Sequence, residues 1–332
     1  MVKPKLRWGV IGCASIAQEC VMPAIRKSET GILAALASRS LKKSKDIAEQ
    51  FGVEKAYGSY GELLSDPDID AVYIPLPNHL HCEWSIAAAQ AGKHVLCEKP
   101  AALNAGEAAA MVNAAHNADV KFAEALMYRH HPQLKEIRER IQAGIIGELR
   151  LIRASFTCSS VSQTGNIRFH KETGGGALYD LGEYPLSAAR WMTGTEPYAV
   201  TVYAQYSKAH GGVDMMASGL VEFPGGLSLL FDCGLWAEER RSIELVGSKG
   251  RIVMPFAFSG MEQSGYELYR DGEQVESREL PMNAYVLEID HFGKSVLEGK
   301  PLDFPPEDAV ANLRLLDACR RSALENRRVV LS

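Results

Sequence analysis

The stretch Arg7-Trp-Gly-Val-Ile-Gly-Cys-Ala-Ser-Ile-Ala17 stands close to the start of the chain and decides how its first half folds. An apolar strand expected over residues 6–11 runs into a turn in which glycine and two alanines take the spacing of a G-x-G-x-x-G fingerprint. Small residues are needed there because a pyrophosphate has to approach the backbone N–H groups at the start of the next helix. A tight turn without a ligand would show a similar pattern. The stretch predicts a dinucleotide site made by Gly12, Cys13, Ala14, Ser15 and Ile16.

The residues after the second expected strand indicate which dinucleotide would bind. A helix over residues 15–27, bent at Pro23, and a strand over residues 31–37 complete a β-α-β unit of about 30 residues. A site for NAD usually has Asp or Glu at the end of this strand, to bind the ribose 2′-hydroxyl. This chain has hydroxyl and cationic side chains instead, namely Ser38, Arg39, Ser40, Lys42 and Lys43. These groups suit a 2′-phosphate, so we expect NADP, with NAD or an ordinary solvated helix start as alternatives.

Length, charge and cysteine content limit the classes of protein to consider. The 332 residues suffice for two domains, and a net charge of −5 with a pI near 6.0 gives no electrostatic argument for nucleic acid. No signal peptide is expected, and no apolar run approaches the roughly 18–20 residues of a membrane span. The seven cysteines form no C-x-x-C pair, so neither a metal site nor a disulfide framework is expected. We therefore expect a cytoplasmic protein with reduced thiols and no membrane partner.

The pattern of strands and helices divides the chain into two domains, 1–124 and 125–332. The first alternates short apolar strands with helices, which predicts an α/β, doubly wound parallel sheet of the Rossmann type. Its further expected strands are 71–75, 93–97 and 120–123, and its further helices are 41–51, 60–65, 80–91 and 104–117. The second predicts an α+β domain with a large, mostly antiparallel open sheet. Its expected strands are 148–157, 198–207, 217–223, 227–233, 242–246, 251–254 and 266–269, with hairpin turns at 224–226 and 247–250. Its expected helices are 133–143, 176–192, 284–298 and 306–326.

Polar residues follow two later strands of the first domain. Cys97-Glu98-Lys99-Pro100 comes after the strand at 93–97, at the carboxyl edge where ligands of such sheets bind. A lysine there can touch both a cofactor and a substrate oxygen, although an ordinary surface turn with a salt-bridged lysine would have the same sequence. Asn78-His79-Leu80-His81 reaches the same edge, with one histidine expected in the site and the other in solvent. The candidate cofactor-binding residues here are Pro75, Asn78, His81, Glu98 and Lys99.

A second glycine-rich stretch, Gly174-Gly-Gly-Ala-Leu-Tyr-Asp-Leu-Gly-Glu-Tyr184, leads into the helix expected over 176–192. Asp180 and Tyr184 are four residues apart and so share one helix face. A tyrosine beside a lysine can act as an acid or base, because the ammonium group lowers the phenol pKa. A helix that packs its tyrosine into the core and exposes its aspartate would have the same spacing. Arg129 and Arg168 add cations that either bind substrate or lie on the surface.

In this order the motifs resemble the Gfo/Idh/MocA family of oxidoreductases over essentially the whole chain. The matching pieces are Gly9-Val-Ile-Gly12, Asn78-x-x-His81, Glu98-Lys99-Pro100, Glu124-Ala-x-Met127-Tyr-Arg129 and Gly174-Gly-Gly-Ala-Leu-x-Asp180-x-Gly182-x-Tyr184. Many members of the family have histidine where this chain has Tyr184. With tyrosine at this position, the motif resembles the branch of the family that includes glucose–fructose oxidoreductase, dimeric dihydrodiol dehydrogenase and xylose dehydrogenase. The resemblance implies that Lys99 and Tyr184 are the catalytic pair and that Asp180 holds the substrate. It also implies a homodimer or higher homo-oligomer, formed through the open sheet of a substrate-binding second domain.

The function implied is NADP(H)-dependent hydride transfer between nicotinamide and a carbinol or carbonyl carbon of a sugar, polyol or cyclic diol. Tyr184 would move the hydroxyl proton, and Lys99 would lower its pKa or bind the reacting oxygen. The expected substrate-binding residues are Lys99, Arg129, Arg168, Asp180 and Tyr184. One alternative is an NADPH-dependent ketoreductase of a nucleotide-linked sugar, with Arg129 or Arg168 toward the pyrophosphate. The other is a non-catalytic dinucleotide-binding regulator, against which the presence of both Lys99 and Tyr184 argues.

Overall fold

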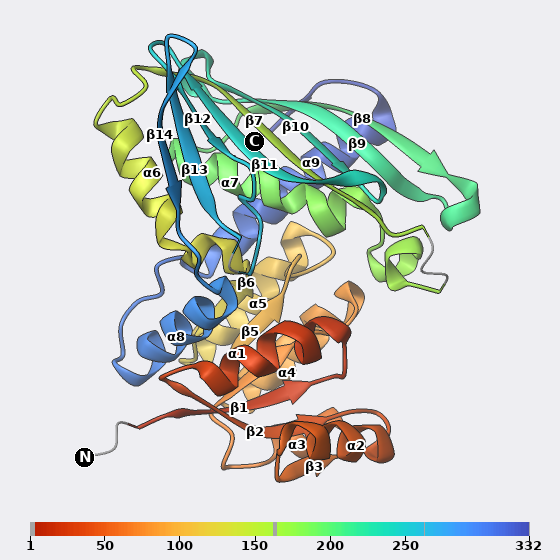
Figure 1. Ribbon diagram of the computed structural model, residues 1–332. Coiled ribbons are helices and arrows are strands. Elements are labelled where there is room, and N and C mark those ends of the chain that lie inside the picture. The colour runs from red at the N-terminus through yellow and green to blue at the C-terminus, as the bar shows by residue number, and fades with distance from the viewer. Residues whose placement is uncertain (1–3, 162–164, 262, 332) are drawn as a thin grey trace. The chain divides into compact units, whose positions relative to one another are not determined.

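The computed structural model describes residues 4–161, 165–261 and 263–331, and Figure 1 shows its strands and helices. The chain forms two compact units, residues 1–127 with 285–311 and residues 128–284 with 312–332. The sequence-based division, 1–124 and 125–332, treats the chain as two continuous pieces, whereas the segment 285–311 clusters with the first unit. This segment includes most of helix α8 (Ala284–Leu297).

Contacts between residues that are far apart in sequence attach α8 to the first unit. The ring of Phe292 packs against that of Trp8, with centroids 5.3 Å apart. The Asp290 carboxylate accepts hydrogen bonds from the Ser28 hydroxyl at 2.6 Å and from the Thr30 backbone N–H at 3.0 Å. Local periodicity carries no information about such pairings, which is why the sequence pattern did not assign this helix to the first unit.

The first unit is built on a six-stranded parallel sheet in the order β3-β2-β1-β4-β5-β6. Its order reverses between β1 and β4, which is the point where such sheets bind ligands outside their carboxyl ends. The three-residue β3 was not expected, since so short a strand shows no period. The strands are β1 (Leu6–Ile11), β2 (Gly31–Ala37), β3 (Lys55–Tyr57), β4 (Ala71–Ile74), β5 (His94–Glu98) and β6 (Phe122–Ala125).

Three helices of the first unit, α2, α3 and α5, begin at capping side chains. Ser40, Ser59 and Asn104 each accept a hydrogen bond from the backbone N–H three residues further on. The helix expected to bend at Pro23 contains a π-helical turn just before that residue, because proline has no N–H for the usual α-helical bond. The helices are α1 (Met22–Lys27), α2 (Leu41–Phe51), α3 (Tyr60–Leu64), α4 (His81–Gln90) and α5 (Ala105–Asn117).

The second unit contains a nine-stranded sheet in the order β14-β13-β12-β11-β7-β10-β9-β8-β15. The predicted, mostly antiparallel sheet is confirmed, with β7 and β10 as the parallel pair. Both expected hairpins connect antiparallel neighbours, β9 with β10 and β11 with β12. The charged strand β14 was not expected, because its sequence Glu-Gln-Val-Glu-Ser-Arg-Glu has no apolar alternation. The strands are β7 (Leu149–Ser159), β8 (Ala199–Ser207), β9 (Val213–Glu222), β10 (Ser228–Gly234), β11 (Trp236–Gly247), β12 (Arg251–Met254), β13 (Gly265–Arg270), β14 (Glu273–Glu279) and β15 (Val329–Val330).

Three helices accompany this sheet, α6 (Pro132–Gln142), α7 (Glu183–Thr193) and α9 (Glu307–Glu325), the last of which starts in the first unit. Side chains alternate between two faces along the strands. Val202 and Phe231 are buried, whereas Tyr203 is 65% exposed and Leu230 is 40% exposed. One face of the sheet therefore forms the core of the unit and the other is open. None of the helices in the described part of the chain is long and apolar enough to cross a bilayer.

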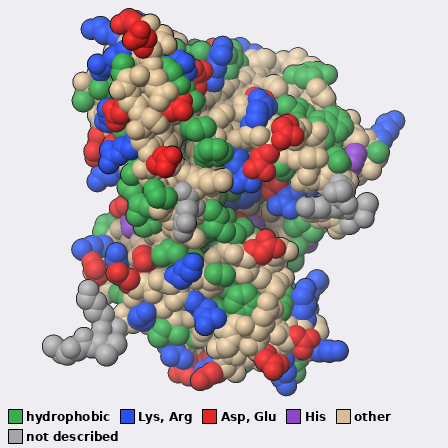
Figure 2. Space-filling view, in the orientation of Figure 1, with side chains coloured by type: hydrophobic (Ala, Val, Ile, Leu, Met, Phe, Trp, Pro, Cys, Tyr) green, Lys and Arg blue, Asp and Glu red, His purple; other side chains and the backbone are tan. Residues whose placement is uncertain are grey.

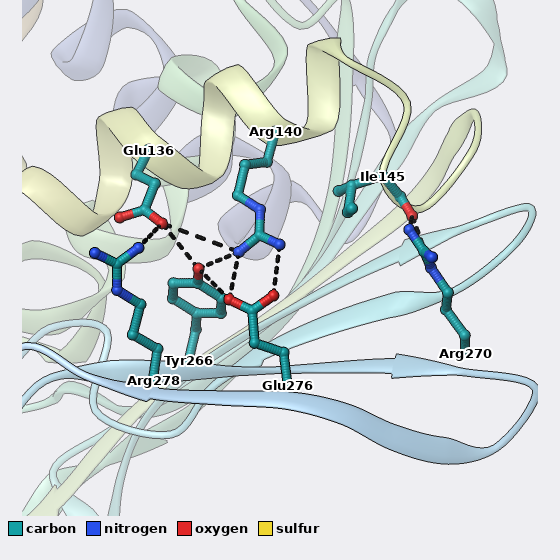
Figure 3. Close-up of polar contacts among 7 residues, drawn as sticks. All are labelled: Glu136, Arg140, Ile145, Tyr266, Arg270, Glu276 and Arg278. Atoms are coloured by element: carbon teal, nitrogen blue, oxygen red, sulfur yellow. Dashed lines mark hydrogen bonds and ion pairs between the residues drawn. The ribbon is translucent and has the colours of Figure 1, made fainter.

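A charged network fastens the β13–β14 hairpin to α6 (Figure 3). Arg140 of α6 donates two hydrogen bonds to the Glu276 carboxylate of β14, at 2.7 and 2.6 Å. The Tyr266 hydroxyl lies 2.9 Å from Glu136 Oε1, which also pairs with Arg278. The Arg140 guanidinium is the main cause that holds the pKa of Glu276 at about 2. The network anchors a charged strand that has little apolar surface of its own.

Candidate active site

The turn after β1 has the form of a pyrophosphate cradle. Gly12 has a φ of +115°, and a Cβ added to it would lie 2.9 Å from a methyl group of Leu76, so glycine is required there. The Gly12 N–H donates to the Ala37 carbonyl at 2.9 Å, and the Gln18 side chain donates to the Cys13 carbonyl at 3.1 Å. The backbone is already helical at Ser15 and Ile16. A closed turn that leads directly into a helix N-terminus suits a dinucleotide pyrophosphate.

The candidate cofactor-binding residues follow four neighbouring strands of one parallel sheet. Gly12 to Ile16 come after β1, Ser38 to Ser40 after β2, Pro75 and Asn78 after β4, and Glu98 and Lys99 at the end of β5. Because the carboxyl ends of parallel strands share one edge, the fold brings all of these groups to the same side of the first unit.

Cations and hydroxyls gather at the end of β2, as the sequence predicted. The Ser38 hydroxyl accepts from the Ser40 N–H at 3.3 Å, and the Ser40 hydroxyl caps α2. Arg39 and Lys43 are exposed. Arg39 also lies near the Tyr60 phenol, where its charge opposes the rise in pKa that burial causes. Sequence reasoning missed Tyr60, which comes from α3 and packs edge-on against Trp84 of α4 at 4.8 Å.

Two carboxylates hold the loop that carries Lys99. Glu98 accepts from the Tyr73 hydroxyl at 2.6 Å and from the Lys99 backbone N–H at 3.2 Å. Glu124 of β6 accepts from the Ala101 N–H at 2.8 Å. Burial is the main reason that the pKa of Tyr73 lies well above its usual value, so it remains a hydrogen-bond donor to Glu98. The backbone on each side of Lys99 is therefore tied to the sheet.

His81 lies at the expected edge, and its ring joins two loops. Nδ1 is 2.9 Å from the Pro100 carbonyl oxygen, and Nε2 is 2.7 Å from that of Leu76. Burial lowers the pKa of His81 to about 4, with the two carbonyls acting in the opposite direction. A neutral imidazole has one ring N–H, so His81 donates to one of these two carbonyl oxygens while its ring packs between the backbone of Leu76 and that of Pro100. Within the described ranges, no group of three His, Cys, Asp or Glu side chains is arranged to hold a metal ion.

In the second unit the structure brings together Arg168, Asp180 and Tyr184. Arg168 Nε donates to Asp180 Oδ2 at 2.5 Å. The pKa of Arg168 is raised, first by the Asp180 carboxylate and to a smaller extent by the Tyr184 phenol. The helix expected over 176–192 is present, but it opens with a π-helical turn over Leu178–Gly182. Such turns are frequent at functional sites.

Three aromatic rings surround Tyr184, which is 6% exposed. Phe156 of β7 meets it at a centroid distance of 4.9 Å, Phe258 at 5.6 Å and Tyr128 at 5.7 Å. This aromatic box fixes the plane of the phenol ring. Sequence reasoning gave none of these rings a role: Tyr128 stood only within the Met127-Tyr-Arg129 motif, and alternation marks Phe156 only as buried. Arg129 follows Tyr128 in a 3₁₀ turn and is 7% exposed.

Comparison with known proteins identifies the family. Residues 6–126 match the model of an oxidoreductase family with an NAD-binding Rossmann fold, and residues 134–253 match the GFO/IDH/MocA C-terminal domain. The chain belongs to the Gfo/Idh/MocA oxidoreductase family. This Gfo/Idh/MocA protein is 35% identical to D-xylose 1-dehydrogenase (NADP(+)) 2 of Haloferax volcanii over 321 residues, which cover 96% of this chain and 97% of that protein.

Solved structures of other family members superpose on it closely. A 3-ketoreductase from Actinomadura kijaniata, crystallised with NADP and TDP-benzene, has a TM-score of 0.90 at 33% identity and covers 96% of this chain and 98% of its own. Aldose-aldose oxidoreductase from Caulobacter crescentus, crystallised with glycerol, has a TM-score of 0.91 at 28% identity, covering 98% and 100%. The Gfo/Idh/MocA protein described here is therefore an NAD(P)-dependent oxidoreductase of a family that acts on CH–OH groups.

Proposed function

We propose that the protein is an NADP(H)-dependent oxidoreductase of a sugar, polyol or cyclic diol, with Tyr184 and Lys99 as its catalytic pair. The observation that carries this proposal is the placement of Tyr184, whose ring is fixed by the aromatic box and whose phenol lies near the Arg168–Asp180 ion pair. A positioned phenol can give or take a proton at a substrate oxygen. The hydrogen bond from Arg168 orients the Asp180 carboxylate, as an acceptor for substrate hydroxyl groups needs to be.

Each remaining group has a separate role in this proposal. When bound, the nicotinamide supplies the hydride donor or acceptor, and the protein supplies position and charge. Lys99, on its braced loop, provides a cation for the developing charge on the substrate oxygen or for the phenol. Arg129 and Arg168 contribute to substrate binding. Residues 12–16, together with Pro75, Asn78, His81 and Glu98, form or support the cofactor cradle.

The preference for NADP rests on the end of β2. Ser38, Arg39 and Lys43 stand where a site for NAD usually has a carboxylate, and both cations are exposed and able to meet a phosphate. NAD is the alternative, and its ribose 2′-hydroxyl would then hydrogen-bond to the same serine hydroxyl groups. The measured affinities of the two cofactors decide between these assignments.

A second candidate is a ketoreductase of a nucleotide-linked sugar. The specific observation that favours it is the 33% identity to the Actinomadura kijaniata 3-ketoreductase, whose crystals contained TDP-benzene. Arg129 or Arg168 would then bind the diphosphate. A non-catalytic regulator is the least favoured function, because the chain has both Lys99 and Tyr184.

The open face of the large sheet supports a proposal of homodimers or higher homo-oligomers. Leu230 pairs with Leu220 across strands and is 40% exposed, so apolar groups meet on a face that is left exposed in the described part of this unit. On the side shown in Figure 2, basic and acidic side chains are interspersed, with no field of one sign to attract nucleic acid.

All seven cysteine thiols are free, in keeping with the proposed cytoplasmic location.

A substrate panel tests the proposed function. Purified protein is assayed for reduction of NADP⁺ and NAD⁺ with aldoses, polyols and trans-diols, and for oxidation of NADPH with keto-sugars and nucleotide-linked keto-sugars. Turnover of a free sugar or diol that Tyr184→Phe abolishes supports the first candidate. Turnover confined to nucleotide-linked substrates supports the second. Quenching of NADPH fluorescence without any turnover supports the regulator.

A further inference from the structure

A buried carboxylate lies beneath the start of the helix that carries Asp180 and Tyr184. Asp214, in β9, is 8% exposed, and its Oδ2 accepts a hydrogen bond from the Leu178 backbone N–H at 2.7 Å. Leu178 opens the π-helical turn that continues into α7. The first N–H groups of a helix have no partner within the helix, and they attract negative charge. Asp214 is thus a capping group supplied by the sheet, from a residue 36 positions away in sequence.

Gly176 connects this cap with the site residues. Its φ is +117°, and a Cβ added to it would lie 2.0 Å from Asp214 Oδ1, so the carboxylate occupies the space that any other side chain would need. The Gly176 N–H donates to the Arg168 carbonyl at 2.9 Å, and its carbonyl accepts from the Asp180 N–H at 3.0 Å. The loop that carries Arg168 and the helix that carries Asp180 therefore meet at the residue against which Asp214 packs.

The surroundings of Asp214 make its charge costly to keep. Burial raises the pKa of Asp214 to about 6, while the backbone N–H groups that it accepts from and the Arg320 guanidinium of α9 oppose this rise. Two further titratable groups interact with Asp214, the Cys233 thiol of β10 and the Tyr206 phenol of β8, and it raises the pKa of both. Arg320 itself lies over the Tyr179 ring, at 4.3 Å from the ring centroid. An uncharged side chain would be cheaper to bury, so the cap needs a reason beyond packing.

We propose that Asp214 is a positioning residue for the reaction, which holds the Arg168–Asp180 pair and Tyr184 in register by capping their helix and filling the space beside Gly176. This inference rests on the proposed function, because the roles of Asp180 and Tyr184 are what make their exact positions matter. Asp214 acts only through these residues and touches neither substrate nor cofactor.

Two substitutions separate the cap from general packing. Asp214→Asn keeps the shape and one acceptor oxygen, whereas Asp214→Ala leaves the buried Leu178 N–H without its acceptor. Protonation of Asp214 removes its negative charge and turns one acceptor oxygen into a hydroxyl group, so it weakens the cap as the Asp214→Asn substitution does. The wild-type kcat should therefore fall toward the value of the asparagine variant as the pH drops through about 6.

The experiment compares wild type, Asp214→Asn, Asp214→Ala and Glu222→Gln, a matched control on the same strand whose carboxylate pairs with Arg328. For each we measure kcat and KM from about pH 5 to 8, the NADPH dissociation constant, and hydrogen exchange of the amides in residues 176–184. We expect Asp214→Ala to lower kcat roughly 10- to 100-fold, the scale of a small misplacement, and to speed exchange in this segment. Asp214→Asn should have a kcat roughly fivefold below that of wild type at pH 7 to 8, the cost of one weakened hydrogen bond, and should show no further fall below about pH 6. NADPH affinity should stay within about twofold in all variants, because the cofactor residues lie in the other unit.

Two results would overturn the proposal. The first is a folded Asp214→Ala enzyme with wild-type kcat and unchanged exchange in residues 176–184. The second, which decides the matter if the alanine variant does not fold, is an asparagine variant whose kcat follows the wild-type pH profile. Absence of any turnover by wild type contradicts the proposed function instead, and the exchange data then still decide whether Asp214 is the cap.

Discussion

Arg168 and Asp180 are joined by a 2.5 Å hydrogen bond from the guanidinium Nε to the carboxylate, across 12 positions of sequence. The bond orients the carboxylate that we expect to hold the substrate. Arg168→Ala should therefore lower kcat/KM by roughly 10- to 150-fold, the equivalent of one charge-assisted bond of about 1.5–3 kcal/mol. Steady-state kinetics check this, with Arg270→Ala as the control, since Arg270 contacts only the Ile145 carbonyl in the view of Figure 3. Equal losses in both variants would show that the effect is not local to the site.

Tyr184→Phe keeps the ring inside its aromatic box and removes only the hydroxyl group. If that group transfers the proton, kcat should fall by about 10²- to 10⁴-fold, with little change in cofactor affinity. Lys99→Ala should cost at least as much and should also shift the pH dependence of kcat, because the reacting oxygen loses a nearby cation. Tyr198→Phe serves as the control, because Tyr198 is 44% exposed and its hydroxyl bonds to Glu222. If Tyr184→Phe keeps a kcat near that of wild type while chemistry limits the rate, another group must transfer the proton.

Arg39→Ala tests the choice of cofactor. Loss of a charge-assisted contact to a 2′-phosphate should raise the NADPH dissociation constant about 10- to 150-fold, with a much smaller effect on NADH. Fluorescence titration measures both constants. Lys45→Ala, an exposed position on α2, the helix that follows Arg39, should change neither. Wild-type protein that binds NADH as tightly as NADPH contradicts the assignment.

Glu276 should make stability depend on pH through its pair with Arg140. Its pKa in the folded protein is about 2, below the usual 4.5, so the pair contributes fully above about pH 4.5 and is lost as the pH falls toward 2. The Glu276 side chain is 33% exposed, so solvent screening limits the contribution to about 1 kcal/mol. Glu276→Gln should reduce the free energy of unfolding by this amount at pH 7 and converge with wild type at low pH. Urea unfolding at several pH values measures this, and the exposed Glu273→Gln should follow the wild-type curve.

Leu230→Arg tests assembly through the open face of the large sheet. The new cation would lie beside Arg153, its cross-strand neighbour on β7, and would remove an apolar contact from the proposed interface. Light scattering should show wild type as a dimer or larger species and the variant as a monomer. Leu324→Arg, at a 61% exposed position on α9, should leave the assembly intact. A wild-type protein that is monomeric in dilute solution contradicts the proposal.

The sequence by itself determined the elements with strong local patterns. Strand β1, the turn at Gly12 and the helix that follows were all predicted, because apolar runs, a positive φ and a proline act over a few residues. The carboxyl-edge position of Lys99 also followed from sequence, since alternating strands and helices require a parallel sheet. The glycine-rich stretch before Asp180 marked a close approach of backbone to another group, but its partner could not be named.

Only the tertiary structure decided which distant residues meet. Three contacts join segments that are far apart in sequence. Asp214 packs against Gly176, three aromatic rings surround Tyr184, and Asp290 attaches α8 to the first unit. These contacts depend on sheet order and register, which local periodicity does not encode. The charged strand β14 is a further case, because ion pairs with α6 rather than apolar alternation hold it in the sheet. Local propensity acts over a few residues, whereas packing and buried charge are decided by the whole fold.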